Sequence, residues 1–287
     1  MIPNTSIHLT ECPRDAMQGL KEFVPTDLKV KYLNNLLKVG FEVLDFGSFV
    51  SPKAIPQMAD TAEVLSRLDM SATDTKLLAI VANLRGAEQA LAYDAISYTG
   101  FPLSVSETFQ QRNTNKSIAQ ALAEVAEIQD LCLRRNMHLV VYLSMAFGNP
   151  YGDAYNPEQV SALCDKLNAM DIKHIALSDT TGVSTADNIG PLFRELAPKY
   201  PKVQFAAHLH TRPEDAAAKV RAAYEAGCRR FDAALKGYGG CPMAADTLTG
   251  NMDTELMIAE LESLGEKPSI NRNALDEAGL VAAEVFA

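Results

Sequence analysis

The sequence lacks several features that mark common classes of protein. Its 287 residues contain no apolar run that approaches the length of a membrane span. The first residues, MIPNTSIHLTECPRD, have neither the basic start nor the apolar stretch of a secretory signal. Lysine and arginine number 26 against 36 aspartates and glutamates, which gives a net charge of −10, and nucleic acid requires a basic face. We therefore expect a cytoplasmic protein that binds neither membranes nor nucleic acid.

Cysteine is scarce and irregularly spaced. The five cysteines are odd in number and form no CxxC pair, which argues against a disulfide framework and fits a reducing compartment. Cys241 lies in the glycine-rich stretch KGYGGCPMAADTLTGN, where a thiol is accessible. These glycines lack the GxxxxGK[ST] pattern of a phosphate-binding loop. The other four cysteines lie in or beside expected helices and strands and are interpreted as small packing residues: Cys12, Cys132, Cys164 and Cys228.

What the sequence does contain is a regular alternation of short apolar runs with amphipathic stretches. Gly40 and Gly227 are placed to end helices, and Asn156 followed by Pro157 is placed to begin one. Eight segments read as strands: Ile7–Leu9, Val43–Phe46, Leu77–Val81, Ala95–Tyr98, His138–Leu143, His174–Leu177, Val203–Ala207 and Arg230–Ala234.

Eight strand–helix units in this length favour a (β/α)8 TIM barrel over a doubly wound open sheet. No linker of proline, serine or glycine divides the chain. We expect a single domain over residues 1–287, with extra C-terminal helices from about residue 254.

Polar residues follow the expected strands, where a barrel of this kind places its active site. Arg14, Asp15 and Gln18 come after the first strand, and Asp45 lies within the apolar run FEVLDFGSF. A carboxylate in such a run needs a partner or a function. Arg14 and Asp15 also fit a surface ion pair. Tyr142 fits core packing, and Asp179 in SDTTG fits a cap on the turn.

The strongest chemical signal is His208-Leu209-His210. Residues i and i+2 of a strand project from the same face, so both imidazoles can reach one point at the barrel mouth. Two histidines with oxygen donors suit a divalent cation such as Mg²⁺ or Mn²⁺. Asp15 is the natural carboxylate for this site and Asn251 a further oxygen donor. Two hydrogen-bonded histidines without metal are the alternative interpretation.

Several motifs together resemble those of the 3-hydroxy-3-methylglutaryl-CoA lyases. The resemblance runs in register from about residue 8 to the C-terminal region and rests on PRDAMQ, SFVSPKAIPQMAD, ANLRG, SETFQQRNTNKSI, NPYGD, DTTGVST, HLH and GYGGCPMAADTLTGNMDTE. It implies a metal-dependent barrel that cleaves a 3-hydroxyacyl-CoA into acetyl-CoA and acetoacetate. It also implies a homodimer and a place in leucine degradation.

The resemblance assigns roles to individual residues. It implies that Asp15, His208, His210 and Asn251 bind the divalent cation. Catalytic roles fall to Arg14, Asp45, His208 and Cys241, with Arg14 neutralising the enolate and Cys241 delivering a proton from a loop that closes over the site. The substrate is expected to contact Arg14, Gln18, Tyr142 and Asp179. Arg112 and Lys116 either bind the phosphates of CoA or belong to a solvated loop.

Three positions depart from the family pattern. Asp45 stands where the family has glutamate, Arg212 follows the histidines in HTRPED where the family reads HDTYG, and Lys236 replaces a small residue. These departures leave two alternatives open. The protein can be a related metal-dependent lyase or aldolase acting on another 3-hydroxyacid or its thioester. It can also be a barrel that retains the metal and only binds a ligand.

Overall fold

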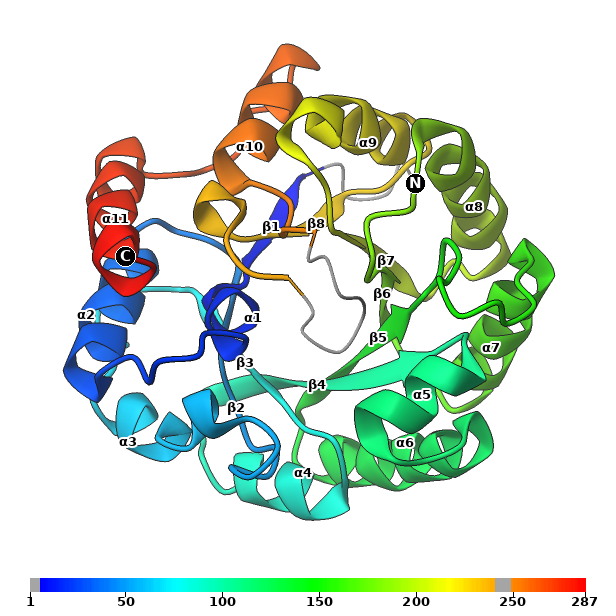
Figure 1. Ribbon diagram of the computed structural model, residues 1–287, viewed down its shortest axis with the longest axis horizontal. Helices are drawn as coiled ribbons and strands as arrows, with labels where there is room; N and C mark the ends of the chain where they lie inside the picture. The colour runs from blue at the N-terminus through cyan, green and yellow to red at the C-terminus, as the bar shows by residue number, and fades with distance from the viewer. Residues whose placement is uncertain (1–5, 241–248) are drawn as a thin grey trace.

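The protein is a closed barrel of eight parallel strands surrounded by helices (Figure 1). The computed structural model describes residues 6–240 and 249–287. Each strand pairs with the next along the chain, and β8 closes the ring against β1. The strands are β1 (His8–Glu11), β2 (Val43–Ser48), β3 (Lys76–Ile80), β4 (Ile96–Ser104), β5 (His138–Ser144), β6 (His174–Asp179), β7 (Gln204–Leu209) and β8 (Arg230–Ala233).

The helices lie outside the ring of strands, as the view down the barrel shows (Figure 1). Short 3₁₀ turns η1 (Pro56–Met58) and η2 (Leu235–Gly237) follow β2 and β8. The α-helices are α1 (Pro13–Gln18), α2 (Thr26–Leu37), α3 (Thr61–Ser66), α4 (Leu84–Ala90), α5 (Glu107–Thr114), α6 (Ile118–Arg134), α7 (Pro157–Ala169), α8 (Ala186–Lys199), α9 (Pro213–Glu225), α10 (Thr254–Ser263) and α11 (Arg272–Val285).

The predicted barrel and its eight strands are confirmed. Asn156 caps α7 with its side chain and Pro157 begins that helix, as expected. Gly40 and Gly227 have φ of +91° and +95°, a backbone conformation that suits glycine after a helix. The fourth strand was predicted too short, because Gly100 and Pro102 are typical strand breakers. In the barrel both residues lie within β4 and pair with β5.

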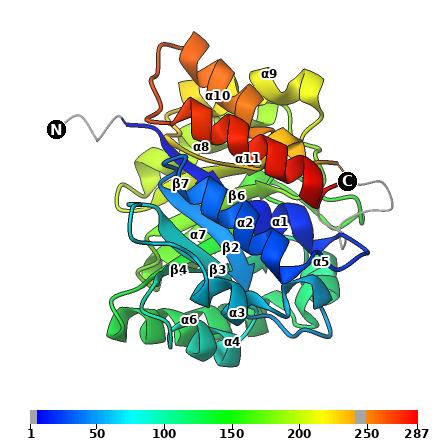
Figure 2. The same ribbon diagram turned by 90° about the vertical axis from the view of Figure 1, so that its left-hand side faces the viewer.

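The extra C-terminal helices are also confirmed. Helix α10 begins at Thr254, where the extension was expected, and α11 lies alongside α2 (Figure 2). Phe286 packs edge-on against Tyr32 of α2, with ring centroids 6.2 Å apart. These helices therefore cover the outside of the barrel beside β1 and β8.

Two apolar layers hold the barrel together. The larger one lies between the strands and the helices, and a smaller one fills the barrel interior with Val43, Leu78, Ile80, Tyr142, Ala176 and Ala206. Ile80 and Tyr142 of this interior layer also line the cavity at the carboxyl ends of the strands. No helix in the described ranges is long and apolar enough to span a membrane.

Candidate active site

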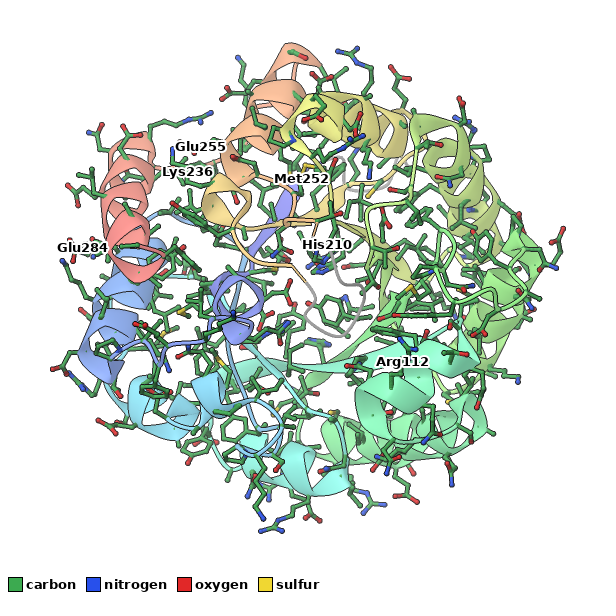
Figure 3. The ribbon with its side chains drawn as sticks, in the orientation of Figure 1. Arg112, His210, Lys236, Met252, Glu255 and Glu284 are labelled. Atoms are coloured by element: carbon green, nitrogen blue, oxygen red, sulfur yellow. The ribbon has the colours of Figure 1, made fainter. Side chains whose placement is uncertain are left out.

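A cavity lies at the carboxyl ends of the strands, where the sequence predicts the site. Its empty volume is about 920 Å³, part of which opens to solvent. Figure 3 shows His210 near the barrel axis, and His208, Arg14 and Asp15 line the same cavity. The remainder of the lining is largely apolar and is formed by Gln18, Val50, Ala54, Ile55, Ile80, Ala82, Pro102, Phe109, Asn113, Thr114, Tyr142, Ser144, Ser178 and Thr180.

Arg14 is held in this cavity by Asp45. The guanidinium Nε lies 3.0 Å and Nη2 lies 2.6 Å from Asp45 Oδ2, and both side chains are buried. Burial raises the pKa of Asp45 to about 6, against the opposing effect of the Arg14 charge. Burial would lower the pKa of Arg14, but Asp45 and Asp15 reverse that effect and leave it raised. Arg14 and Asp45 therefore form a buried ion pair, and the surface pair that the sequence left open is excluded.

Asp15 and Gln18 complete the surroundings of Arg14. Arg14 Nη1 donates to Asp15 Oδ1 at 3.0 Å and to Gln18 Oε1 at 2.8 Å, while Gln18 Nε2 donates to the same Asp15 oxygen at 2.6 Å. The other oxygen, Asp15 Oδ2, is buried and has no hydrogen-bond partner among the described residues. An unpaired buried carboxylate oxygen is costly. Asp15 Oδ2 is thus free for a ligand from the cavity.

The two histidines are oriented by hydrogen bonds on their far sides. His210 Nδ1 lies 3.1 Å from the carbonyl oxygen of Thr249, which can only accept, so Nδ1 carries the proton. His208 Nδ1 lies 3.2 Å from Asp232 Oδ2. Both contacts leave Nε2 with the lone pair, as in histidines that bind metals. His210 Nε2 lies 3.9 Å from Asp15 Oδ2.

Burial and charge act differently on the two rings. Burial lowers the pKa of His210, and the raising effect of Asp15 does not restore it. For His208, burial also lowers the pKa, but the hydrogen bond and charge of Asp232 leave it raised. Donor atoms of Asp15, His208 and His210 lie within 4.8 Å of one another, and all three side chains are buried. This cluster has the donor set and the spacing for one metal ion.

Asn251 lies beside this cluster and Cys241 falls outside the described residues. Asn251 is buried and pairs with His210 in an antiparallel bridge. Its Nδ2 donates to the carbonyl of Tyr238 at 2.9 Å, which leaves the amide oxygen for another contact. Before residue 241 the chain passes close to α1, because a Cβ on Gly239 would lie 2.5 Å from Ala16 Cα. Gly239 and Thr249, which are described on either side of 241–248, therefore lie against α1 and His210.

Tyr142 and Asp179 have different places. Tyr142 lines the cavity and packs edge-on against His208, with ring centroids 5.3 Å apart. Asp179 accepts hydrogen bonds from the backbone N–H groups of Val183 and Ser184, both at 2.9 Å, and lies outside the cavity lining formed by the described residues. The structure thus places Asp179 as the cap of the turn after β6, which was the alternative interpretation.

Arg212 and Lys236, the two positively charged residues that depart from the family pattern, also lie away from the cavity lining formed by the described residues. Arg212 is exposed at the start of α9 and pairs with Asp215 at 3.1 Å. Lys236 Nζ lies 2.6 Å from Glu255 Oε2, and Figure 3 shows both side chains beside α10. Arg112 stacks on Tyr151, 4.6 Å from the ring centroid, and Lys116 pairs with Glu124. Of the three departures, only Asp45 touches a residue of the cavity.

Comparison with known proteins agrees with this geometry. The family model described as HMGL-like matches residues 7–281. The chain belongs to this HMGL-like family. It is 32% identical over 93% of its length to the cytoplasmic 3-hydroxy-3-methylglutaryl-CoA lyase of Rattus norvegicus, of which the match covers 77%. It is also 32% identical, over 93% of this chain and 88% of the relative, to the 3-hydroxy-3-isohexenylglutaryl-CoA/hydroxy-methylglutaryl-CoA lyase of Pseudomonas aeruginosa.

Among solved structures, the chain is similar to an HMG-CoA lyase from Acinetobacter baumannii in complex with coenzyme A and 3-methylmalate. The TM-score is 0.91 at 30% identity, and the match covers 100% of this chain and 93% of the other. The fold is therefore shared over the whole barrel.

Two residues of this HMGL-like site were not predicted from the sequence. Asp232 supports His208, and the buried Lys219 reaches Asp179 Oδ2 at 3.2 Å and the His210 carbonyl at 3.0 Å. Asp232 lies within β8, whereas polar site residues were expected after the strands. Lys219 lies in an ordinary amphipathic helix, and only the barrel closure brings it under β6 and β7.

Proposed function

We propose that the protein is a divalent-metal-dependent carbon–carbon lyase that cleaves 3-hydroxy-3-methylglutaryl-CoA to acetyl-CoA and acetoacetate. The observation that carries this proposal is the position of Arg14, fixed by Asp45 in the same cavity as the Asp15, His208 and His210 cluster. The names of the relatives, which are HMG-CoA lyases, support the substrate.

The residues present fit a divalent cation. Asp15 Oδ2 is buried without a hydrogen-bond partner among the described residues, and both histidine lone pairs lie on Nε2. Asp15, His208, His210 and Asn251 would hold Mg²⁺ or Mn²⁺ through nitrogen and oxygen donors. When bound, such an ion polarises the hydroxyl and carbonyl oxygens of the substrate. The positive charge also suits a site in which Asp15 and Asp45 share the guanidinium of Arg14 and Asp232 lies against His208.

Arg14 stabilises the enolate in this proposal. A guanidinium has five N–H groups, and four of those of Arg14 donate to Asp45, Asp15 and Gln18. The remaining Nη2–H is available to the thioester oxygen on which negative charge develops as the carbon–carbon bond breaks. Asp45 and Gln18 act as positioning residues, because they hold the guanidinium before the substrate arrives.

His208 supplies the second function that the cleavage requires. Asp232 holds its ring through Nδ1, and this contact raises the pKa of His208, which makes Nε2 a better acceptor for the proton of the tertiary hydroxyl. A neutral imidazole has one lone pair. His208 Nε2 can therefore either contact the cation or accept the proton, but it cannot do both at the same time.

Cys241 and the acyl-CoA contacts complete the proposal. We assign delivery of a proton to the acetyl-CoA carbanion to Cys241, on the basis of the resemblance and of flanking residues that border the site. Tyr142 and the apolar lining would receive the acyl group. Arg112 stacks on Tyr151 at the exposed side of α5, where it can meet a phosphate of CoA.

Further features rest on the sequence or on the resemblance. We propose a single domain, a homodimer, a cytoplasmic location and a place in leucine degradation. Relatives named as cytoplasmic support the location, although others are named as mitochondrial.

A lyase acting on another 3-hydroxyacyl-CoA is the second candidate. It is supported by Asp45, the one family departure that contacts the cavity-lining Arg14, and by the isohexenylglutaryl-CoA named for one relative. The barrel that only binds a ligand has no comparable support.

The direct test is release of acetoacetate from 3-hydroxy-3-methylglutaryl-CoA, measured with Mg²⁺ or Mn²⁺, with chelator, and with Cys241→Ala. We expect turnover that chelation abolishes and that falls by about 10³-fold in the variant. If the protein still binds Mn²⁺ but does not turn over this thioester, the proposed substrate is wrong and a thioester with another acyl group becomes the candidate.

A further inference from the structure

Cys12, His208 and Asp232 form a second cluster of donor atoms next to the proposed catalytic site. Their thiol, imidazole and carboxylate atoms lie within 4.8 Å of one another, and all three residues are buried. Among the residues that the structure describes, the Cys12 thiol makes one weak hydrogen bond, 3.9 Å from the carbonyl oxygen of Thr10. We propose that this cluster binds a thiophilic divalent ion such as Zn²⁺ or Cd²⁺, and that this ion competes with the catalytic ion for His208.

The barrel backbone fixes the three donors relative to one another. Asp232 of β8 is paired in register with His208 of β7 on one side and with Thr10 of β1 on the other. The Cys12 N–H donates to the Ala233 carbonyl at 2.8 Å, which ties the start of α1 to β8. Neighbouring ligand atoms of a tetrahedral zinc site are about 3 to 4 Å apart. His208 Nδ1 and Asp232 Oδ2, at 3.2 Å, already have this spacing.

The two clusters select different ions because their donors differ. Asp15, His210 and Asn251 offer oxygen and nitrogen, which suit Mg²⁺ and Mn²⁺. A cysteine thiolate with one imidazole and one carboxylate suits zinc or cadmium and offers little to magnesium. A thiophilic ion would therefore enter the Cys12 cluster even when magnesium is abundant.

Sharing of His208 makes the two sites antagonistic. Binding at the Cys12 cluster releases the thiol proton to solvent, and coordination through His208 Nδ1 moves the ring proton to Nε2. The neutral ring then has no lone pair for the side that faces Asp15 and His210. Coordination through Nε2 would use the same lone pair directly. In both cases the catalytic ion loses a ligand, so the thiophilic ion inhibits the enzyme.

The test measures ion binding separately from activity. Cadmium is titrated into Cys241→Ala protein, which lacks the thiol of the proposed proton donor, and the ultraviolet thiolate-to-cadmium charge-transfer band is recorded. The same titration is made with Cys12→Ala and Cys12→Ser added to this background. We expect one equivalent of Cd²⁺ to produce the band, and both double variants to lose it. A band that persists without Cys12, or a Cys241→Ala protein that gives none, would overturn the proposal.

A second arm measures inhibition and rests on the proposed lyase function. Zn²⁺ is titrated against acetoacetate release at fixed Mg²⁺ in the wild type, in Cys12→Ala and in the matched control Cys228→Ala, which removes a different buried thiol. We expect Cys12→Ala to raise the half-inhibitory Zn²⁺ concentration at least tenfold, and Cys228→Ala to leave it unchanged. Equal sensitivity of all three proteins would contradict the antagonism. A Cys12-dependent cadmium band, together with a wild-type protein that shows no lyase turnover, would refute the proposed function and keep the site.

Discussion

Two buried ion pairs lie at the mouth of the barrel, and they differ in what they face. Arg14 and Asp45 join α1 to β2, and Arg14 lines the cavity. Lys219 and Asp179 join α9 to β6, and Asp179 instead holds the turn at Val183 and Ser184. Both pairs take their carboxylate from a strand, Asp45 from within β2 and Asp179 from the end of β6, and a role in the site was considered from the sequence for each of them.

The difference separates the group that we propose to be catalytic from one that holds the backbone. The guanidinium of Arg14 has an N–H left after its protein partners are satisfied, whereas the Asp179 carboxylate is occupied by backbone, by the Ser184 hydroxyl and by Lys219. We therefore assign chemistry to the first pair. The second pair supports the backbone of His210, because Lys219 also donates to its carbonyl.

The largest expected effect is that of Arg14→Met on turnover. Loss of the guanidinium removes the charge that stabilises the enolate, and we expect kcat/KM to fall by about 10³-fold, equal to about 4 kcal/mol. Acetoacetate release under saturating metal measures this effect. Activity within tenfold of the wild type would show that Arg14 is not the enolate partner.

Lys219→Met is expected to act on stability. It leaves the Asp179 carboxylate buried without its cation, and we expect the free energy of unfolding to fall by about 3 kcal/mol. Urea denaturation measures this loss, and Asp179→Asn combined with Lys219→Met should recover part of it. A Lys219→Met protein of unchanged stability whose kcat falls as far as that of Arg14→Met would erase the distinction between the two pairs.

Asp45→Asn is a milder test of the Arg14–Asp45 pair than Arg14→Met. The amide keeps the size of the side chain but removes the charge that orients Arg14, so we expect kcat to fall about 30-fold, or about 2 kcal/mol. Asp179→Asn is the matched control and should change kcat far less. Equal losses in the two variants would contradict the comparison.

Glu11 gives a smaller, pH-dependent effect outside both pairs. Burial raises its pKa to about 8, while Leu235 N–H and Thr254 Oγ1 donate to its oxygens at 2.7 and 2.6 Å. The folded protein therefore retains a proton that the unfolded chain releases above its ordinary pKa, so stability falls as pH rises through about 8. We expect a loss of about 1 kcal/mol between pH 6 and 7 that Glu11→Gln abolishes. The check is the urea midpoint measured as a function of pH in the wild type and in Glu11→Gln. An equal fall of the midpoint with pH in both proteins would refute this assignment.

The smallest effect is expected at the charged family departures. Arg212→Met and Lys236→Met remove surface ion pairs beside α9 and α10, and we expect turnover and stability to change by less than about twofold and 0.5 kcal/mol. A change in the KM for the thioester in either variant would show that the side chain removed contributes to substrate binding.

Much of the fold and part of the site can be predicted from the sequence, for a physical reason. Apolar runs of strand length repeat locally, and residues i and i+2 such as His208 and His210 share a face in any strand. The partners Asp232 and Lys219 could not be predicted, because closure of the ring brings them to His208 and Asp179 across 24 and 40 positions. For Asp179 the resemblance implied a contact with substrate, whereas its place after a strand in SDTTG fitted a turn cap, and the position in the sequence alone does not separate the two.

The most direct test of the account is Mn²⁺ binding measured by electron paramagnetic resonance in the wild type, Asp15→Ala and Asp179→Asn. We predict one tightly bound Mn²⁺ in the wild type, loss of that binding in Asp15→Ala, and retention of it in Asp179→Asn. Binding that survives Asp15→Ala but is lost in Asp179→Asn would contradict the account, because it would place the metal at the second ion pair.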